Sequence, residues 1–233
     1  MKKIKNAIVV AIDGPAGAGK STIAKIVARE LGYLYIDTGA MYRAITWKAI
    51  QQKINLHDSR ALVRLSKETK IKLQPDFKKH QLHVFVDEQD VTHKIRSEKV
   101  SLHTNAVASI RGIRLFLINL QREMAAQTSV VMEGRDIGTD VFPNANIKFY
   151  LDASPLERAR RRYEELKAKG KRVKLEKIAH AIAQRDYRDK HRKVSPLRIA
   201  HDAIVLDSTH LTLEQVAKNI LQNIELRISV NPK

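Results

Sequence analysis

The sequence predicts a single α/β domain in which a central parallel sheet of five strands is flanked by helices. Five short apolar runs have the length of buried strands, and stretches with helical periodicity alternate with them. A glycine-rich turn directly follows the first run, and no low-complexity linker divides the 233 residues. A chain of this length can form one well-packed domain with insertions. The five runs are 8–12, 33–37, 129–133, 147–151 and 203–207.

The composition indicates a soluble globular protein with an anionic partner. Hydrophobic residues make up 43% of the chain, and no apolar run approaches the roughly 20 residues that cross a bilayer. The apolar run after the basic start is too short for a signal peptide. The absence of cysteine excludes disulfides and thiol nucleophiles and fits a cytoplasmic protein. A formal net charge of +18 is compatible with nucleic acid, nucleotides or acidic membranes as partners.

The glycine-rich turn has the spacing of a phosphate-binding loop. Gly14 is followed, after four residues, by Gly19, Lys20 and Ser21, between a predicted strand and a helix that begins at about Lys20. Backbone N–H groups of such a loop and the helix N-terminus bind phosphate oxygens. The lysine reaches the β- and γ-phosphates, and the serine hydroxyl ligates Mg²⁺. The residues predicted to bind a nucleoside triphosphate are Gly14, Pro15, Ala16, Gly17, Ala18, Gly19, Lys20, Ser21 and Thr22.

A second polar turn follows the second predicted strand. It reads Asp37-Thr38-Gly39-Ala40-Met41-Tyr42-Arg43 and leads into a helix that extends to about Lys53. Ligands of open α/β sheets collect at the carboxyl ends of strands, and an arginine one turn into the helix suits a phosphate. We therefore expect a second-substrate site here. The alternative is an ordinary helix cap supplied by Asp37 or Thr38.

Residues 54–100 depart from this pattern. Ile71–Leu73 and Leu82–Val86 alternate apolar and polar residues, and Pro75-Asp76 and Asp87-Glu88 are typical of turns. The region is predicted to be a small antiparallel insertion, with a structural role as the alternative to a binding role. A single long helix is expected from about Val100 to Gln127.

The later part of the chain combines strand ends with a strongly basic hairpin. The third apolar run ends at Glu133, where a carboxylate can hold Mg²⁺ directly or through water. Ser154-Pro155-Leu156-Glu157 begins a helix, and a break at Lys169-Gly170-Lys171 predicts a helical hairpin. We expect the hairpin to be a lid that closes over phosphates, with a solvated charged face as the alternative. The arginines that favour this interpretation are Arg158, Arg161, Arg162, Arg185, Arg188 and Arg192. A last strand precedes a helix that begins with a capping box at Thr212 and Gln215.

The order of these motifs resembles that of bacterial cytidylate kinases, essentially from end to end. Besides the two turns, the resemblance rests on Glu133-Gly134-Arg135-Asp136-Ile137-Gly138-Thr139, Leu151-Asp152-Ala153-Ser154 and Arg185-Asp186-Tyr187-Arg188-Asp189. It implies a P-loop kinase fold and the transfer of the γ-phosphoryl group of ATP to CMP or dCMP, with Mg²⁺. It also implies one domain with a core (1–37, 101–153 and 195–233), a nucleoside monophosphate-binding region (38–100) and a lid (154–194).

The resemblance also implies roles for individual residues. Lys20, Arg135, Arg158, Arg162 and Arg192 are the expected catalytic residues. Because arginines cluster on the hairpin, we expect Arg158, Arg162 and Arg192 to be exposed without ligand and to converge on phosphates with it. The acceptor phosphate is assigned to Arg43, Arg135 and Arg192, the ribose to Arg185 and Asp189, and the cytosine to Asn105, Arg114 and Asp136. Asp37, Thr38 and Tyr42 complete the substrate site. Ser21 is expected to bind the metal directly, and Glu133 through water.

Three positions depart from the pattern of the family. Glu133 stands where aspartate is usual, Asn105 where serine is usual, and Thr38 where serine is frequent. Asparagine can both donate and accept, so base recognition is expected to persist.

Two other functions remain open at this point. One is a UMP/CMP kinase or another small-molecule kinase. The other is a nucleic-acid-binding P-loop ATPase, which the basic charge favours and the scarcity of aromatic residues among the basic ones disfavours. We expect a cytoplasmic monomer that binds ATP, CMP and dCMP, and neither nucleic acid nor membrane.

Overall fold

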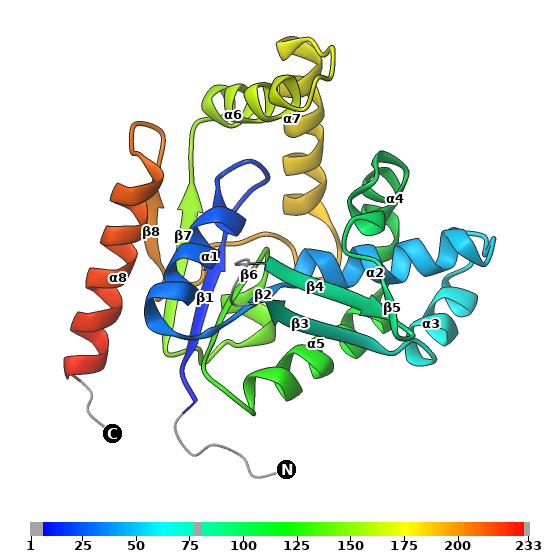
Figure 1. The fold of residues 1–233 in the computed structure, drawn as a ribbon, viewed down its shortest axis with the longest axis horizontal. Helices are drawn as coiled ribbons and strands as arrows, with labels where there is room; N and C mark the ends of the chain where they lie inside the picture. The colour runs from blue at the N-terminus through cyan, green and yellow to red at the C-terminus, as the bar shows by residue number, and fades with distance from the viewer. Residues whose placement is uncertain (1–6, 77–80, 231–233) are drawn as a thin grey trace. The chain divides into compact units, whose positions relative to one another are not determined.

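A computed structural model describes residues 7–76 and 81–230 (Figure 1). Its larger sheet has the strand order β2-β6-β1-β7-β8, and β7 pairs in parallel with both β1 and β8. The smaller sheet is antiparallel with the order β3-β4-β5. The prediction of a five-stranded parallel sheet with a small antiparallel insertion is confirmed. The strands of the larger sheet are β1 Val9–Asp13, β2 Leu34–Asp37, β6 Val130–Gly134, β7 Ile147–Asp152 and β8 Ile204–Asp207.

The described chain divides into two compact units. The first comprises Gly32–Val130, and the second comprises Ile8–Leu31 together with Val131–Lys233. The phosphate-binding loop and the hairpin predicted as a lid both belong to the second unit. Residues 101–130, which the sequence assigns to the core, group with the insertion in the first unit.

The second unit is built around apolar strands. Val10, Ala11 and Ile12 of β1 are fully buried, and β7 is buried along most of its length, as runs in parallel sheets are. Helix α1 (Lys20–Leu31) packs against α8 (Leu213–Val230). The predicted helical hairpin is confirmed as α6 (Pro155–Ala168) and α7 (Leu175–His191), which lie side by side around a small core of Ala159, Ile178 and Ile182 (Figure 1).

Two predicted helix starts in this unit are confirmed by their hydrogen bonds. The Ser154 hydroxyl accepts the Glu157 N–H at 3.3 Å, and Pro155 takes the first helical position. The Thr212 hydroxyl accepts the Gln215 N–H at 3.2 Å, and the Gln215 side chain accepts the Thr212 N–H at 2.9 Å. These reciprocal bonds satisfy N–H groups that a helix start leaves without partners.

The first unit has a separate hydrophobic core. Strands β3 (Ile71–Asp76) and β4 (Gln81–Val86) pair antiparallel, with β5 (Gln89–Asp90) beyond β4. Met41, Ile45 and Leu117 are among the fully buried side chains of this core. Its remaining elements are α2 Thr38–Gln51, α3 Ser59–Lys67, the short 3₁₀ turn η1 Lys94–Arg96, α4 Glu98–Ala108 and α5 Arg111–Ala125.

The expected single helix from Val100 to Gln127 is wrong, because two helices meet at Ser109 and Ile110. Ile110 is extended, with φ −81° and ψ 115°, and precedes the first turn of α5. The Ser109 hydroxyl donates to the Asn105 carbonyl, which helps to end α4. A Cβ on Gly112 would lie 2.7 Å from a methyl group of Val63, so glycine lets α5 approach α3 closely. Helix α3 itself was not anticipated.

Among the described helices, none is long and apolar enough to cross a membrane.

Gly14 generates a prediction for the phosphate-binding loop. It has φ +147°, and a Cβ at this position would lie 2.0 Å from the Leu151 carbonyl oxygen. We expect Gly14→Ala to lower the free energy of unfolding by about 3 kcal/mol or more, because both the backbone and the strand must shift. Gly170→Ala is the matched control, because Gly170 also has a positive φ, +72°, but has no atom within 4 Å of the added Cβ. The control should cost only about 1 kcal/mol in urea unfolding. Equal losses for the two variants would contradict the prediction.

Candidate active site

The phosphate-binding loop places Lys20 in a buried position. Its ammonium group donates to the Pro15 carbonyl at 2.6 Å, within the loop itself. Burial, followed by the positive charge of Arg135, lowers the pKa of Lys20 to about 7. The lysine is therefore held at the start of α1, where the helix dipole favours anions. Anionic phosphates bound there would raise the pKa of Lys20 again.

Ser21 and Glu133 come together as the sequence predicts. The Ser21 hydroxyl donates to a carboxylate oxygen of Glu133 at 2.5 Å, and Glu133 is buried near the end of β6. The longer side chain at this position thus reaches the loop. A hydroxyl and a carboxylate, completed by phosphate and water oxygens, are the donor set that Mg²⁺ takes.

Asp13 joins this site although the sequence analysis did not single it out. It ends β1 directly before Gly14, and its two carboxylate oxygens accept the N–H groups of Ile137 at 2.9 Å and Gly138 at 2.7 Å. Burial raises the pKa of Asp13 to about 7, against the opposite effect of these two hydrogen bonds. The only sequence signal was an acidic residue at the end of an apolar strand. The segment that it holds continues into a π-helical turn, Ile137–Val141.

Two arginines, one from the segment after β6 and one from α7, lie around the buried carboxylate of Asp189. The Arg135 guanidinium donates to Asp189 at 2.9 Å, and Arg185 approaches the same carboxylate at 4.0 Å. Burial opposes ionisation of Asp189, but Arg135 and Arg185 outweigh it and lower the pKa of that carboxyl. Nearby, Arg192 donates to the buried Asp136 at 3.4 Å. The structure thus places five of the predicted site residues in two ion-pair groups, Arg135 and Arg185 on Asp189 and Arg192 on Asp136.

The expectation that Arg158 is exposed without ligand is wrong. Only 4% of Arg158 is exposed, and its guanidinium donates to the carbonyls of Ala153 at 2.9 Å and Ala16 at 3.0 Å and to Asp186 at 2.5 Å. Arg158 therefore links the phosphate-binding loop to both helices of the hairpin. The reason for its burial is that three acceptors surround it, two of them backbone carbonyls that sequence patterns do not reveal.

The other two lid arginines differ from each other. The expectation of exposure is wrong for Arg192, whose side chain is only 9% exposed and donates to the Ser195 carbonyl at 2.5 Å. Arg162 is exposed, as expected, and pairs with Glu165 at 2.6 Å on the surface of α6.

The second polar turn, which lies in the first unit, both caps a helix and places a carboxylate next to two arginine side chains. Asp37 caps α2 by accepting the Ala40 N–H at 2.9 Å, so the capping alternative is confirmed for this residue. The same carboxylate accepts from Arg43 at 2.7 Å, and Arg96 lies 3.8 Å from it. Burial works against ionisation, but Arg43 and Arg96 together hold the pKa of Asp37 below its usual range. Thr38 and Tyr42 are buried beside it, and Arg96 is a residue that the sequence analysis missed.

Arg114, predicted to contact the base, is almost completely buried. Its guanidinium donates to the Ala108 carbonyl at 3.0 Å and lies 5.3 Å from the centre of the Tyr42 ring. A cation over an aromatic face is attracted to it, so Tyr42 helps to fix Arg114. Asn105 lies half-buried on α4.

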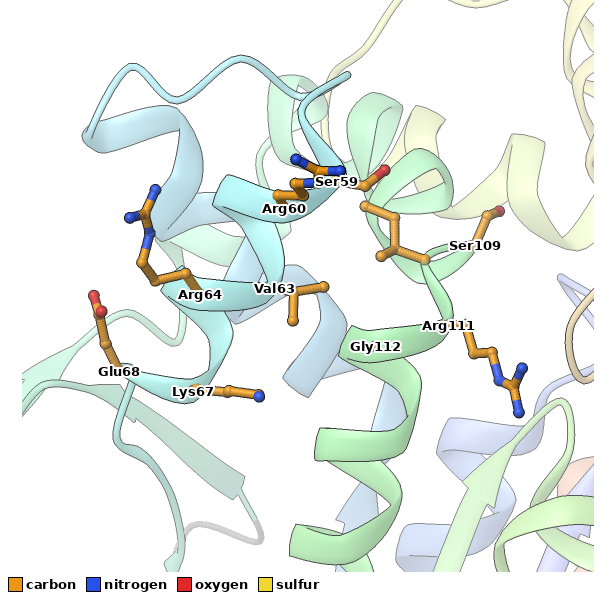
Figure 2. A pocket seen from close by; sticks show the side chains of 10 residues that line it. Ser59, Arg60, Val63, Arg64, Lys67, Glu68, Ser109, Arg111 and Gly112 are labelled. Carbon is orange, nitrogen blue, oxygen red and sulfur yellow. The ribbon is translucent and has the colours of Figure 1, made fainter.

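A surface hollow of about 950 Å³ lies between α3 and the start of α5 (Figure 2). None of the predicted site residues lines it. The side chains of Arg64 and Arg111 extend away from its centre in Figure 2, and the lining consists largely of exposed residues. The hollow is therefore not a candidate active site. Its lining residues are Ser59, Arg60, Val63, Arg64, Lys67, Glu68, Ser109, Ile110, Arg111 and Gly112.

Comparison with known proteins agrees with the order of the motifs. The sequence model of the family described as cytidylate kinase matches residues 10–226. The chain is 48% identical over 222 residues to the cytidylate kinase of Caldicellulosiruptor bescii, which covers 95% of this chain and 96% of that protein. It is 50% identical over 216 residues to the cytidylate kinase of Desulforamulus reducens, which covers 93% and 96% of the two chains.

Among solved structures, an uncharacterized protein from Eubacterium ventriosum has a TM-score of 0.53 at 13% identity, and the match covers 94% of this chain and 98% of that one. This is a likeness of fold alone. The family match and the two relatives extend over nearly the whole sequence, including the phosphate-binding loop, the insertion and the helical hairpin. The chain therefore belongs to the cytidylate kinase family.

Proposed function

We propose that this protein transfers the γ-phosphoryl group of ATP to CMP or dCMP and gives ADP with CDP or dCDP. The observation that carries the proposal is the buried Lys20 of the phosphate-binding loop, placed in one compact unit with Arg135, Asp136 and Asp189. A loop of this kind is built for a triphosphate. The arginine and the two carboxylates offer groups for a second, phosphorylated substrate.

The reaction does not strictly need a general base, because the attacking atom is an oxygen of the acceptor phosphate. Catalysis then rests on aligning donor and acceptor and on neutralising the charge of the transferring group. Lys20 supplies one positive charge at the loop, and the phosphates of ATP keep it protonated by raising its lowered pKa.

The residues present fit Mg²⁺. Ser21 would bind the ion directly and Glu133 would hold it through water, since their oxygens lie 2.5 Å apart beside the loop. When bound, the ion neutralises charge on the phosphate oxygens of the donor.

We assign the acceptor groups as follows. Arg43, Arg135 and Arg192 hold the phosphate, Arg185 and Asp189 meet the ribose, and Asn105, Arg114 and Asp136 read the cytosine. Asp37, Thr38 and Tyr42 support these groups from α2 and its cap. Arg162, exposed on α6, is the lid arginine available to a phosphate.

Arg158 takes a different part from the one that its sequence motif indicates. It is buried against the Ala16 carbonyl of the loop and against Asp186 of α7. We infer that it positions the lid helices against the phosphate-binding loop. Closure of the lid would exclude water and suppress hydrolysis of ATP.

A coupled assay with ATP, Mg²⁺ and a panel of acceptors tests the proposed function. CMP and dCMP should be phosphorylated well, and UMP, AMP and GMP poorly. Equal use of CMP and UMP would leave the broader UMP/CMP kinase function. ATP hydrolysis that DNA or RNA stimulates and that needs no acceptor would contradict both the proposed kinase and the proposed absence of a nucleic-acid partner. The proposal includes a cytoplasmic monomer without membrane partners, which this assay does not address.

Lys20→Ala should lower turnover by at least about 100-fold with the fold intact, because its contact strengthens as charge develops in the transition state. Steady-state kinetics and urea unfolding of the same preparation measure both quantities. Arg29→Ala removes an exposed cation from the same helix and should change neither. Near-normal turnover in a folded Lys20→Ala protein would rule out the assignment.

Base choice depends on Arg114 and Asp136. Cytosine offers an amine and an unprotonated ring nitrogen, which suit a carboxylate and a guanidinium, whereas uracil offers a carbonyl and an N–H that leave both groups unpaired. We expect kcat/KM for CMP to exceed that for UMP by at least about 100-fold. Arg114→Ala should reduce this ratio more than it slows turnover with CMP.

The ratio is measured on one preparation with both acceptors, so loss of folded protein cancels from it. Arg111→Ala, an exposed arginine on the first turn of the same helix, is the control and should keep the ratio of the wild type. An unchanged ratio in Arg114→Ala would contradict the pocket assignment.

Asp13 gives the stability of the protein a dependence on pH. Burial raises its pKa from 3.8 to about 7, so the folded protein keeps a proton that the unfolded chain loses earlier. The stability gained through this proton is complete below the unfolded value and is lost as pH rises through the folded one. The free energy of unfolding of the wild type, minus that of Asp13→Asn, should therefore fall between about pH 4 and about pH 7.

Urea unfolding at a series of pH values measures this difference. Asn146→Ala is the control, because it removes an acceptor of the Val9 N–H at the other end of β1 without removing a titratable group. Its difference from the wild type should not depend on pH. A difference for Asp13→Asn that stays constant over this pH range would show that the two N–H groups keep Asp13 ionised throughout.

A further inference from the structure

Three cations of α3 border the surface hollow between α3 and the start of α5. The spacing of Arg60, Arg64 and Lys67 places them on one face of the helix. All three are exposed, and all three line the hollow of about 950 Å³. Arg111, the first residue of α5, lines it from the other helix and is exposed as well. Cations from two helices thus surround one hollow.

These four cations are not neutralised by the protein itself. Within residues 7–76 and 81–230, no ion pair joins any of them to a carboxylate. Glu68 is the one acidic residue among those that line the hollow. The exposed arginines of the hairpin behave differently, because Arg160 and Arg162 pair with glutamates of their own helix at 2.8 Å and 2.6 Å. The positive charge around the hollow is therefore available to a partner.

Folding does not explain this arrangement of charge. Arg60 and Arg64 are four residues apart, and like charges at this spacing destabilise a helix. Arg111 occupies the positive end of the α5 dipole, and the first turn of α5 contains no acidic residue. Both features cost stability in the free protein. An anionic partner would offset that cost.

The base of the hollow is apolar. Val63 and Ile110 are half-buried there, and both pack against the hydrophobic core of the first unit. Gly112 lets the two helices approach closely at this point. Leu115 lies one turn beyond Arg111 on the same face of α5 and is 53% exposed. The hollow therefore offers contacts to apolar side chains as well as to anions.

The directions of the cations limit what can occupy the hollow. In Figure 2 the side chains of Arg64 and Arg111 extend away from the centre on opposite sides of Val63, so they cannot close on one small anion. They can meet several anionic groups spread around the hollow. Among its lining residues, all in the described chain, none is aromatic, whereas proteins that bind single-stranded nucleic acid usually supply aromatic stacking platforms.

An acidic protein segment satisfies both parts of this surface. Its carboxylates can pair with the surrounding cations, and its apolar side chains can pack against Val63 and Ile110. The formal net charge of +18 disfavours a second copy of this chain as the occupant.

We propose that the hollow between α3 and α5 is a docking surface for an acidic segment of another protein. The cations Arg60, Arg64, Lys67 and Arg111 bind its carboxylates, and the apolar base binds the side chains between them. All the lining residues belong to the first unit, and none is a predicted site residue. The proposal therefore does not rest on the proposed function.

A fluorescently labelled peptide tests the proposal with the full chain. The probe alternates pairs of glutamate with single leucines, and its binding is followed by fluorescence anisotropy. One control peptide has glutamine in place of glutamate, and another has serine in place of leucine. A labelled single-stranded RNA of the same length and inorganic phosphate are the other ligands.

The double variant Arg60→Glu with Arg64→Glu should weaken binding of the acidic peptide by about tenfold or more, because two attractive contacts become repulsive. The matched control is Lys218→Glu with Arg227→Glu, which makes the same change of charge on the exposed face of α8. It should weaken binding by less than about threefold, because at moderate salt distant charges are screened. Urea unfolding of both double variants checks that they are folded.

Both control peptides should bind the wild type at least about tenfold more weakly than the probe, since each lacks one of the two kinds of contact. These two comparisons use the unaltered protein, so they do not depend on the folding of a variant. Phosphate should not displace the probe at concentrations that leave the ionic strength unchanged.

Several results would overturn the proposal. Equal weakening by the two double variants would mean that the peptide responds only to the overall charge. Equal binding of the glutamine or the serine peptide would exclude the carboxylate or the apolar contacts. Displacement by phosphate would indicate a site for a small anion. RNA that binds more tightly than the peptide and loses affinity in Arg60→Glu with Arg64→Glu would identify nucleic acid as the partner instead.

Discussion

Asp13 accepts hydrogen bonds from the backbone N–H groups of Ile137 and Gly138, which lie 124 and 125 residues further along the chain. The phosphate-binding loop begins directly after Asp13, and the segment with Arg135 and Asp136 directly precedes Ile137. Two buried hydrogen bonds on one carboxylate thus set the position of the second segment relative to the loop. Because a buried N–H without a partner is costly, this constraint is strong. The remaining contacts of the site are arranged around these two segments.

In both compact units, the buried charge occurs mainly as arginine–aspartate pairs. Arg135 with Asp189, Arg158 with Asp186 and Arg43 with Asp37 each lie within 3 Å, and every member of these pairs is largely buried. Each pair holds a guanidinium in one orientation, at a cost in desolvation that makes it a poor source of stability. The pairs therefore serve orientation better than stability. The large positive charge of the chain does not reside in them, because each is nearly neutral.

Signals that act within a few residues were predictable from the sequence. The capping boxes at Ser154 and Thr212, the glycine-rich turn and the hairpin break at Gly170 all depend on neighbouring residues. Features that depend on distant partners were not predictable. Arg158 is buried because it meets a carbonyl 142 residues away and a carboxylate 28 residues away. Asp13 and Arg96 were overlooked for the same reason. The break between α4 and α5 was missed because apolar residues at Val107, Ile110 and Ile113 continue the helical spacing across it.

That missed break is what gives Arg114, the arginine proposed to contact the base, its position. In a continuous helix the Ala108 carbonyl would accept the N–H of Gly112, four residues further on. Because α4 ends at Ala108, this carbonyl belongs to the last turn, whose carbonyls have no partner within the helix. The Arg114 guanidinium donates to this carbonyl at 3.0 Å, and the same guanidinium lies 5.3 Å from the centre of the Tyr42 ring. A local interruption of helical hydrogen bonding thus supplies the acceptor that orients Arg114. In the single helix that the sequence predicts, this carbonyl would already be bonded within the helix.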